Sequence, residues 1–198
     1  NCDPQLCGKF FGCSFLEDKP GTNWIDTMSV IDNGEEVIVN TNDCPFELSK
    51  TISKKIKDQY KKIDMLLVGY SGASGYPHCF EMTEIEREAA AKKKTDLNYW
   101  RGENYIKLFE PKYFMPFAGR YVLQGKLTQF NSLKGEPELE EGFQYLVSKI
   151  DQNNHQGILL NPNEYFDLTM GTTSKPYEPI NKNMKEEYIT HSLSKILL

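Results

Sequence analysis

Apolar and polar positions divide the chain into short strands and helices. Residues 27–31 and 36–40 are rich in β-branched side chains, and the segment 32–34 (Asp-Asn-Gly) between them is typical of a tight turn. The two segments therefore predict a β-hairpin. The second strand carries apolar side chains on both faces (Val-Ile-Val at 37–39), which predicts a strand inside a sheet that is covered on both sides.

Helical and extended segments then alternate along the chain. The apolar residues Leu48, Ile52, Ile56 and Tyr60 recur at steps of four after Pro45, a spacing that predicts a helix. Strand, helix and strand in succession indicate a parallel pair, and so a fold of the α/β class with a mixed sheet. The remaining expected elements are a strand over 64–69, a glycine-rich loop over 70–77, helical stretches opening at a Thr83-x-x-Glu86 capping box and over 95–109, a strand over 113–117, a helix over 139–150, a strand over 157–160, loop-like chain over 161–182 and a final helix over 185–198.

Composition narrows the choice of partners. The chain of 198 residues is 39% hydrophobic and 26% charged, which is typical of a globular domain. A formal net charge of -5 argues against a general nucleic-acid binder, because such a protein needs a basic surface. No apolar stretch approaches the ~20 residues that span a bilayer. We therefore expect a small-molecule partner, with no nucleic acid and no membrane, and the oligomeric state stays open.

Five cysteines, an odd number, are a poor disulfide framework and favour reduced thiols in the cytoplasm. Cys2, Cys7 and Cys13 are interpreted as small buried or loop residues in preference to a metal cluster, because they lack paired C-x-x-C spacing. The chain begins at Asn1, directly before this group. That beginning indicates that an upstream segment is absent.

The candidate chemistry lies where the expected strands end, at residues 40–44, 70–79 and 116–121. If these strands are parallel neighbours, the three loops open on one edge of the sheet, where ligands collect in α/β proteins. Asp43 follows a buried strand. A carboxylate there either coordinates a cation or accepts backbone N–H groups at the start of the next helix.

Five further side chains or pairs are candidates for ligand binding. Tyr70, Ser71 and Ser74 belong to a glycine-rich loop whose amides could hold an anion or form a plain tight connection. His78 with Cys79 could be a ligand or nucleophile pair, or a loop histidine and a buried cysteine. Arg120 could clamp a phosphate or carboxylate, or form a surface ion pair.

Three segments together resemble a known family. The runs VIVNTNDCP (37–45), IDMLLVGYSGASGYPHCFE (63–81) and KYFMPFAGRYVLQGK (112–126) are similar to the later half of metallo-β-lactamase-fold hydrolases. The subgroup in question includes the lactamase-like domain of CMP-N-acetylneuraminate hydroxylase. The resemblance implies an αββα sandwich, with residues 1–180 as the later part of that domain and 181–198 as a helical extension.

The resemblance also implies a function. It makes the chain a metal-dependent hydrolase of an anionic sugar nucleotide or phosphoester. Zn²⁺ (or Fe or Mn) is held by Asp43, the catalytic and metal-binding residue, and Arg120, Tyr70, Ser71, Ser74 and His78 contact the substrate. The family's H-x-H-x-D-H motif is absent, and no histidine stands near Arg120 where the family has its last ligand.

Two alternatives stay open. One is a sugar-nucleotide-binding domain that supports the redox chemistry of a monooxygenase-type protein with a Rieske centre, although no Cys-x-His pair of Rieske type occurs in this sequence. The other is a non-catalytic binding module without a metal.

Overall fold

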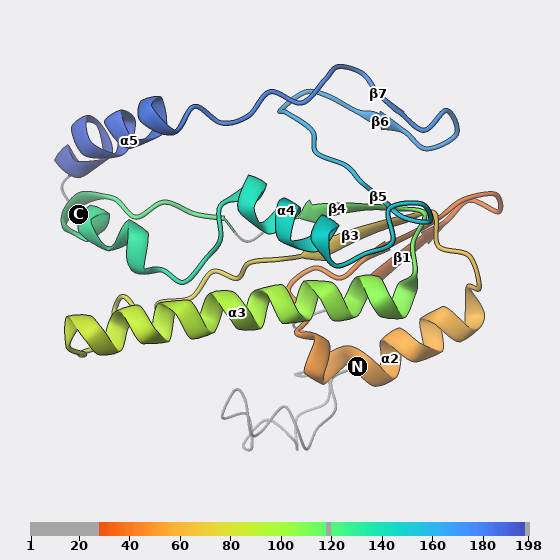
Figure 1. Ribbon diagram of the computed structural model, residues 1–198, viewed down its shortest axis with the longest axis horizontal. Helices are drawn as coiled ribbons and strands as arrows, with labels where there is room; N and C mark the ends of the chain where they lie inside the picture. Colours follow the sequence, from red (N-terminus) through yellow and green to blue (C-terminus); the bar gives the residue numbers. More distant parts are fainter. Residues whose placement is uncertain (1–27, 118–119, 197–198) are drawn as a thin grey trace.

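A five-stranded sheet with strands in chain order forms the centre of the molecule (Figure 1). The computed structural model describes residues 28–117 and 120–196. The strands are β1 (Ser29–Asp32), β2 (Val37–Asn40), β3 (Met65–Gly69), β4 (Tyr113–Phe117) and β5 (Gln156–Gly157). β1 is antiparallel to β2, and the other neighbouring pairs are parallel. The predicted α/β class with a mixed sheet is confirmed.

The first hairpin forms because its turn satisfies its own backbone. The Asp32 carboxylate accepts a hydrogen bond from the amide of Gly34 at 2.8 Å, and the Asn33 side chain accepts from the amides of Glu35 and Glu36 at 2.9 and 2.7 Å. Short polar side chains at these positions favour a turn over continued strand. The predicted hairpin is therefore confirmed.

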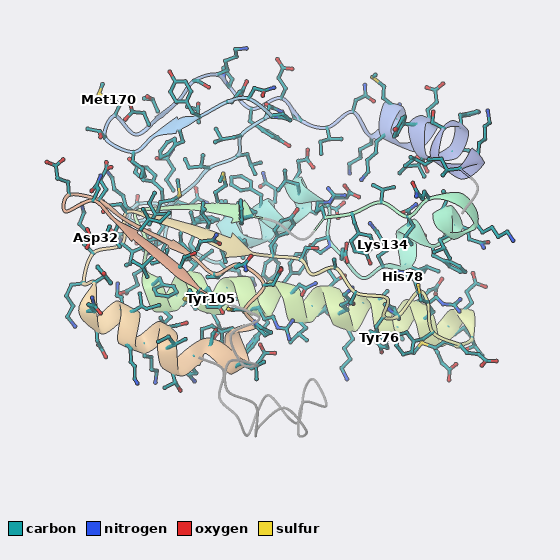
Figure 2. All side chains as sticks on the ribbon, turned by 180° about the vertical axis from the view of Figure 1, so that it is seen from behind. Asp32, Tyr76, His78, Tyr105, Lys134 and Met170 are labelled. Atoms are coloured by element: carbon teal, nitrogen blue, oxygen red, sulfur yellow. The ribbon has the colours of Figure 1, made fainter. Side chains whose placement is uncertain are left out.

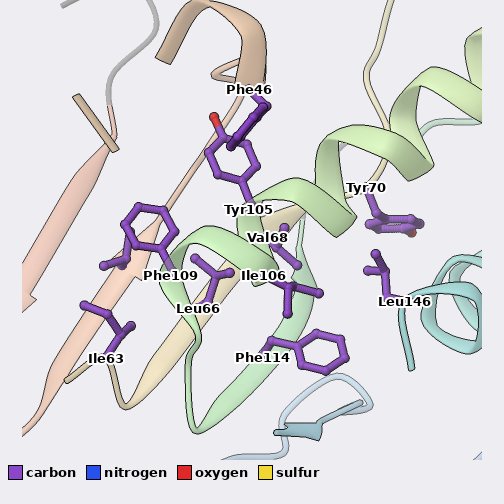
Figure 3. Close-up of a cluster of buried hydrophobic side chains, with 11 residues drawn as sticks. Phe46, Ile63, Leu66, Val68, Tyr70, Tyr105, Ile106, Phe109, Phe114 and Leu146 are labelled. Carbon is purple, nitrogen blue, oxygen red and sulfur yellow. The ribbon is translucent and has the colours of Figure 1, made fainter. Parts of the chain in front are cut away.

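Three helices cover one face of the sheet: α2 (Phe46–Gln59), α3 (Glu84–Phe109) and α4 (Leu139–Ser148). Each connects two parallel strands, and the strand order never reverses, so all three lie on the same side. Figure 3 shows the apolar core between them and the strands. This core consists of Val39, Phe46, Ile63, Leu66, Val68, Tyr70, Tyr105, Ile106, Phe109, Phe114 and Leu146.

The third helix is longer than the sequence predicted. Residues 84–109 form one helix of 26 residues instead of two stretches, because no Gly or Pro interrupts the alanines and lysines at 89–94. The predicted capping box at its start is confirmed, since the Thr83 hydroxyl and the Glu86 side chain each accept a hydrogen bond from the other residue's amide. A helix of this length is about 39 Å long. Its N-terminal half therefore extends well beyond the C-terminal ends of the strands (Figure 1).

The opposite face of the sheet is covered by the C-terminal segment. Here Met65, Tyr113 and Ile158 are buried, with Ile38 and Phe166 among the partly buried side chains around them. Because Val39 packs on the helical face and Ile38 on this one, β2 has apolar contacts on both sides, as predicted.

The C-terminal segment differs from the expectation in several elements. The sequence predicted a loop over 161–182, but a small hairpin forms there from β6 (Phe166–Asp167) and β7 (Thr172–Thr173). β5 pairs over two residues only, at the edge of the sheet. The final helix, α5 (Lys182–His191), starts earlier and ends earlier than predicted, because the Asn181 side chain caps its N-terminus. Two short 3-10 helices, η3 (Gly125–Leu133) and η4 (Leu193–Lys195), complete the described chain.

The expected division of the chain at residue 180 stays a prediction. Across the ranges that the structure describes, no helix combines the length and the apolar composition that crossing a bilayer requires.

Asp64 makes the stability of the fold depend on pH in the acid range. Its side chain is 8% exposed and accepts hydrogen bonds from the Val37 amide at 3.0 Å and from Lys62 at 2.6 Å. Burial alone would raise the pKa of Asp64, but the bonds from Lys62 and Val37 outweigh it and hold the pKa below its ordinary value. A lowered folded-state pKa stabilises the fold above the unfolded-state pKa, and this contribution is lost as the pH falls.

We expect Asp64→Asn to reduce the free energy of unfolding by about 1 kcal/mol at pH 7. The deficit should shrink as the pH is lowered through the acid range, where Asp64 of the wild type is itself protonated. Urea unfolding at a series of pH values measures both effects. Asp58→Asn is the matched control, because Asp58 and its partner Lys61 are both about four-fifths exposed, at 81% and 79%. Equal losses for the two variants would contradict the assignment.

Candidate functional site

The loops after β2, β3 and β4 open on the same edge of the sheet, because these three strands are parallel neighbours. The convergence predicted from chain order is therefore present. Since the strand order has no reversal, however, no crevice opens between the central strands. The polar side chains gather instead beyond the sheet, along the projecting half of α3, where residues 70–83 and 120–138 lie.

Tyr70 begins this region directly after β3. Tyr70 is 2% exposed. Its ring packs closely on Gly142 of α4: a Cβ atom added at Gly142 would lie 2.5 Å from the ring carbon Cδ2. Burial raises the pKa of the Tyr70 phenol far above its ordinary value. Tyr70 is therefore a neutral side chain of the core that borders the polar region.

A buried charge cluster, which we define as Lys94, Lys134 and Glu136, ties α3 to residues 134–136. The Lys94 ammonium donates to the carbonyl oxygens of Tyr76 and Lys134 at 3.1 and 3.0 Å and to Glu136 Oε1 at 3.3 Å. Lys134 Nζ lies 3.8 Å from Glu136 Oε2, and the Glu136 side chain is 2% exposed. Two cations therefore enclose one carboxylate out of contact with water.

Burial shifts the pKa values of Glu136 and Lys134 toward their neutral forms. It raises the pKa of Glu136 above its ordinary value, although Lys94 and Lys134 favour the ionised carboxylate. It lowers the pKa of Lys134, although Glu136 favours the charged ammonium. Tyr121 lies above this cluster, with the Lys134 ammonium 4.5 Å from its ring centroid, and burial followed by the charge of Glu136 raises the pKa of Tyr121 to about 12.

His78 lies beside the same cluster. Figure 2 shows His78 and Lys134 at one end of the molecule, beyond the sheet. His78 is 3% exposed, its ring centroid is 6.1 Å from that of Tyr121, and its Nδ1 atom is buried without a hydrogen-bond partner. Burial, with the charges of Lys94 and Lys134, lowers its pKa. His78 is therefore a neutral imidazole at pH 7, with hydrogen-bonding capacity that the protein leaves unused.

A second group of charges surrounds Glu138, at the start of α4. Arg120 Nη2 lies 2.6 Å from Glu138 Oε2, and the Lys185 ammonium on α5 lies 2.7 Å from both carboxylate oxygens. Burial alone would raise the pKa of Glu138, but the hydrogen bond from Lys185 and the charge of Arg120 outweigh it and lower the pKa. One ionised carboxylate thus bridges two cations from separate parts of the chain.

A pocket of about 240 Å³ opens next to this group, between η3 and α5. Its lining consists of Val122, Asn131, Ser132, Lys134, Glu138, Lys182, Lys185, Glu186 and Ile189.

Several of the predicted site residues meet in this region. Arg120 contacts Glu138, Tyr70 and His78 border the charged side chains, and the Ser74 carbonyl accepts a hydrogen bond from the Tyr121 hydroxyl at 2.9 Å. Ser71 is half-buried in the same loop. The roles predicted for these residues in binding a substrate stay predictions.

Asp43 does not join them. It is exposed, and the residue at the N-cap of α2 is Pro45, with no side-chain cap bond there. Within residues 28–117 and 120–196, no three His, Cys, Asp or Glu side chains are grouped so that they could hold a metal ion. Cys2, Cys7 and Cys13 lie outside the described residues.

Sequence reasoning missed Lys94, Lys134, Glu136, Glu138 and Lys185. The signal available was the charged segment around a glycine at 134–138 (Lys-Gly-Glu-Pro-Glu), which precedes the helix predicted over 139–150 and to which no role was assigned from the sequence. Lys94 was counted as part of a charged helix, and nothing local shows that this lysine faces inward.

Comparisons with known proteins find two similar proteins that are named for an iron–sulfur cluster. The chain is 24% identical, over 169 residues, to two proteins of Mycobacterium tuberculosis, from strains CDC 1551 / Oshkosh and ATCC 25618 / H37Rv. Each is named "Putative Rieske 2Fe-2S iron-sulfur protein". The match covers 83% of this chain and 32% of each relative, so the chain spans about a third of the length of the proteins that it matches. No protein-family model and no solved structure matches the chain.

These findings overturn the metallo-β-lactamase resemblance. The similar proteins are named for an iron–sulfur cluster, and nothing found supports a metallo-β-lactamase hydrolase. The predicted zinc hydrolase, with Asp43 as its metal ligand, was therefore wrong in its function and its cofactor. The physical reason is that a carboxylate after a buried strand needs compensation only if it is itself buried, and Asp43 is exposed.

The residues of this chain do not fit a Rieske cluster either. Such a cluster needs two cysteines and two histidines, and no Cys-x-His pair occurs among the 198 residues. Among the described candidates, the imidazole of His155 bonds the Pro111 carbonyl oxygen at 2.7 Å, and His191 bonds the Glu187 carbonyl oxygen on α5 at 3.2 Å. Cys79 is exposed on the loop after β3.

Proposed function

We propose that this chain is a binding domain that works with a Rieske-type redox protein and does not itself ligate the iron–sulfur cluster. One combined observation carries the proposal. Most of the chain is similar to part of proteins named for a Rieske cluster, while the ligand pairs of such a cluster are absent from its sequence. On this proposal, the part that this chain shares with those proteins binds a ligand and does not hold iron.

The charged region beyond the sheet supports a small anionic molecule as the ligand of this domain. Arg120 and Lys185 supply positive charge next to a pocket, and His78 supplies an unused ring nitrogen nearby. Arg and Lys side chains are the usual partners of phosphate and carboxylate groups. No catalytic step is assigned to these residues: they bind and orient. A cytoplasmic location, with Cys44 and Cys79 as thiols, is part of the proposal.

Iron analysis tests the central claim. The chain is expressed under conditions that support assembly of iron–sulfur clusters and is then purified. We expect it to contain less than about 0.1 iron per chain, compared with the two irons of a [2Fe–2S] cluster. The full-length Mycobacterium tuberculosis relative, prepared in the same way, is the positive control for cluster assembly. Nearly two irons per chain in this protein, with the electron paramagnetic resonance signal of a reduced Rieske centre, would sink the proposal.

A further inference from the structure

Glu138 occupies the position that a bound anion would take. Its carboxylate lies between the guanidinium of Arg120, which follows β4, and the ammonium of Lys185 on α5, at 2.6 and 2.7 Å. Glu138 is the N-cap residue of α4, yet its side chain makes no capping hydrogen bond with that helix. Both of its oxygens are directed to the two cations instead, so another anion could replace it without disturbing α4.

The pocket beside Glu138 is lined by several charged side chains. Lys134, Lys182 and Lys185 line it together with Glu138 and Glu186, and Arg120 adds a fourth cation through its contact with Glu138. Since Lys134 also pairs with Glu136 and Lys182 with Glu141, the cations are all paired, and a displaced Glu138 carboxylate would leave two of them, Arg120 and Lys185, for a ligand. Lys134 has a side chain only 8% exposed, so its charge is not fully screened by water.

One wall of the pocket is attached only weakly to the rest of the protein. α5 contains no buried residue. Its described ion pairs join Lys185 to Glu138 and Lys182 to Glu141, the latter at 3.6 Å between largely exposed side chains. Exposed ion pairs contribute little stability, so this wall can adjust when a ligand replaces the Glu138 carboxylate.

We propose that the pocket between η3 and α5 binds a small phosphate monoester, with its phosphate in the place of the Glu138 carboxylate, between Arg120 and Lys185. A phosphate monoester carries a charge of roughly -1.5 to -2 at pH 7 and three acceptor oxygens, which suits the two cations, Arg120 and Lys185, that now contact Glu138. A pocket of about 240 Å³ lies below the ~300–1,000 Å³ typical of drug-sized ligands. The organic part is therefore small, a phosphorylated sugar or acid and not a dinucleotide. This inference rests on the proposed function for its ligand class.

Calorimetric titration tests the site with defined probes: glucose 6-phosphate, inorganic phosphate and glutarate, each at low ionic strength. We expect glucose 6-phosphate to bind one per chain and more tightly than the other two. Lys185→Gln should weaken this binding about tenfold or more, the cost of one charge-assisted hydrogen bond. Glu138→Gln should strengthen it several-fold, because the competing carboxylate is gone. Lys92→Gln is the matched control, since Lys92 lies on α3 with its side chain 77% exposed and pairs with Asp96.

Other outcomes overturn the inference. If the wild type shows no saturable binding, the proposed site does not exist. If Lys185→Gln and Lys92→Gln lose the same affinity, the effect comes from the overall charge of the protein and not from a contact at this site. Weaker binding by Glu138→Gln, in a variant that circular dichroism shows to be folded, means that the carboxylate is a ligand partner and not a competitor. If inorganic phosphate or glutarate binds as tightly as glucose 6-phosphate, the site is not selective for phosphate monoesters. Iron found in the chain would refute the proposed function, but the titrations would still test the phosphate site independently.

Discussion

Replacing Gly135 with alanine is expected to lower the free energy of unfolding by about 3 kcal/mol. Gly135 has a φ of +68°, a conformation that strains any residue with a Cβ atom. A Cβ atom there would lie 2.6 Å from the carbonyl oxygen of Ala91 and 3.0 Å from Lys94 Cβ, both on α3. The helix backbone cannot yield without breaking its own hydrogen bonds, so residues 134–136 must move away from it.

The measurement is urea unfolding of the wild type and the variant, followed by circular dichroism. Gly72→Ala is the control, because a Cβ atom at Gly72 would meet nothing within 4 Å, and it should change stability by less than about 0.5 kcal/mol. Gly135→Ala should also weaken binding of glucose 6-phosphate, since Lys134 lines the pocket. Wild-type stability in the Gly135 variant would show that residues 134–136 do not pack on α3 as described.

Lys94→Met is expected to cost about 3 kcal/mol at pH 7.5, the usual cost of removing one partner of a buried ion pair. Its side chain is 13% exposed and satisfies two backbone carbonyl oxygens and the Glu136 carboxylate. Methionine fills a similar volume, so the loss comes from these unmet groups and not from a cavity. The double variant Lys94→Met/Glu136→Gln should recover part of the loss, because it no longer buries an unpaired carboxylate.

The pH dependence of this loss has a definite sign. Burial raises the folded-state pKa of Glu136 above its unfolded value, so its contribution to stability is fully present below the unfolded pKa and is lost as the pH rises through the folded pKa. Without Lys94 the folded pKa rises further. The cost of Lys94→Met should therefore be smaller near pH 4 than at pH 7.5, measured by urea unfolding at both. A cost that grows on acidification would contradict the assigned role of Lys94.

The larger elements of the fold could be predicted from the sequence because their signals are local. The turn residues at 32–34, the capping box at Thr83 and the alternation of apolar segments each act within a few residues. The β6 and β7 strands have two residues each, too few for any periodic pattern. The 3-10 helix η3 was missed for a related reason, since Gly125 is its only buried residue and it leaves no stripe.

The candidate site was predictable only where it follows a strand. Tyr70 and Arg120 stand just after β3 and β4, a position that marks them without knowledge of their contacts. Lys94 and Glu136 are 42 residues apart, and Glu138 and Lys185 are 47 apart. Only the packing of α3 and α5 shows that these charges meet. The zinc hypothesis failed in the same way, because the position of Asp43 in the sequence did not reveal that it is exposed.

The length of α3 gives the molecule two ends that respond differently to salt. The end beneath the sheet is held by the residues Tyr105, Ile106 and Phe109, whose apolar burial is indifferent to ionic strength. The projecting end has no strand under it and depends on ammonium, carboxylate and carbonyl groups. Salt is therefore expected to act mainly on the ligand-facing end, whereas acid acts on both ends, because the Asp64 carboxylate also supports β2 at the sheet.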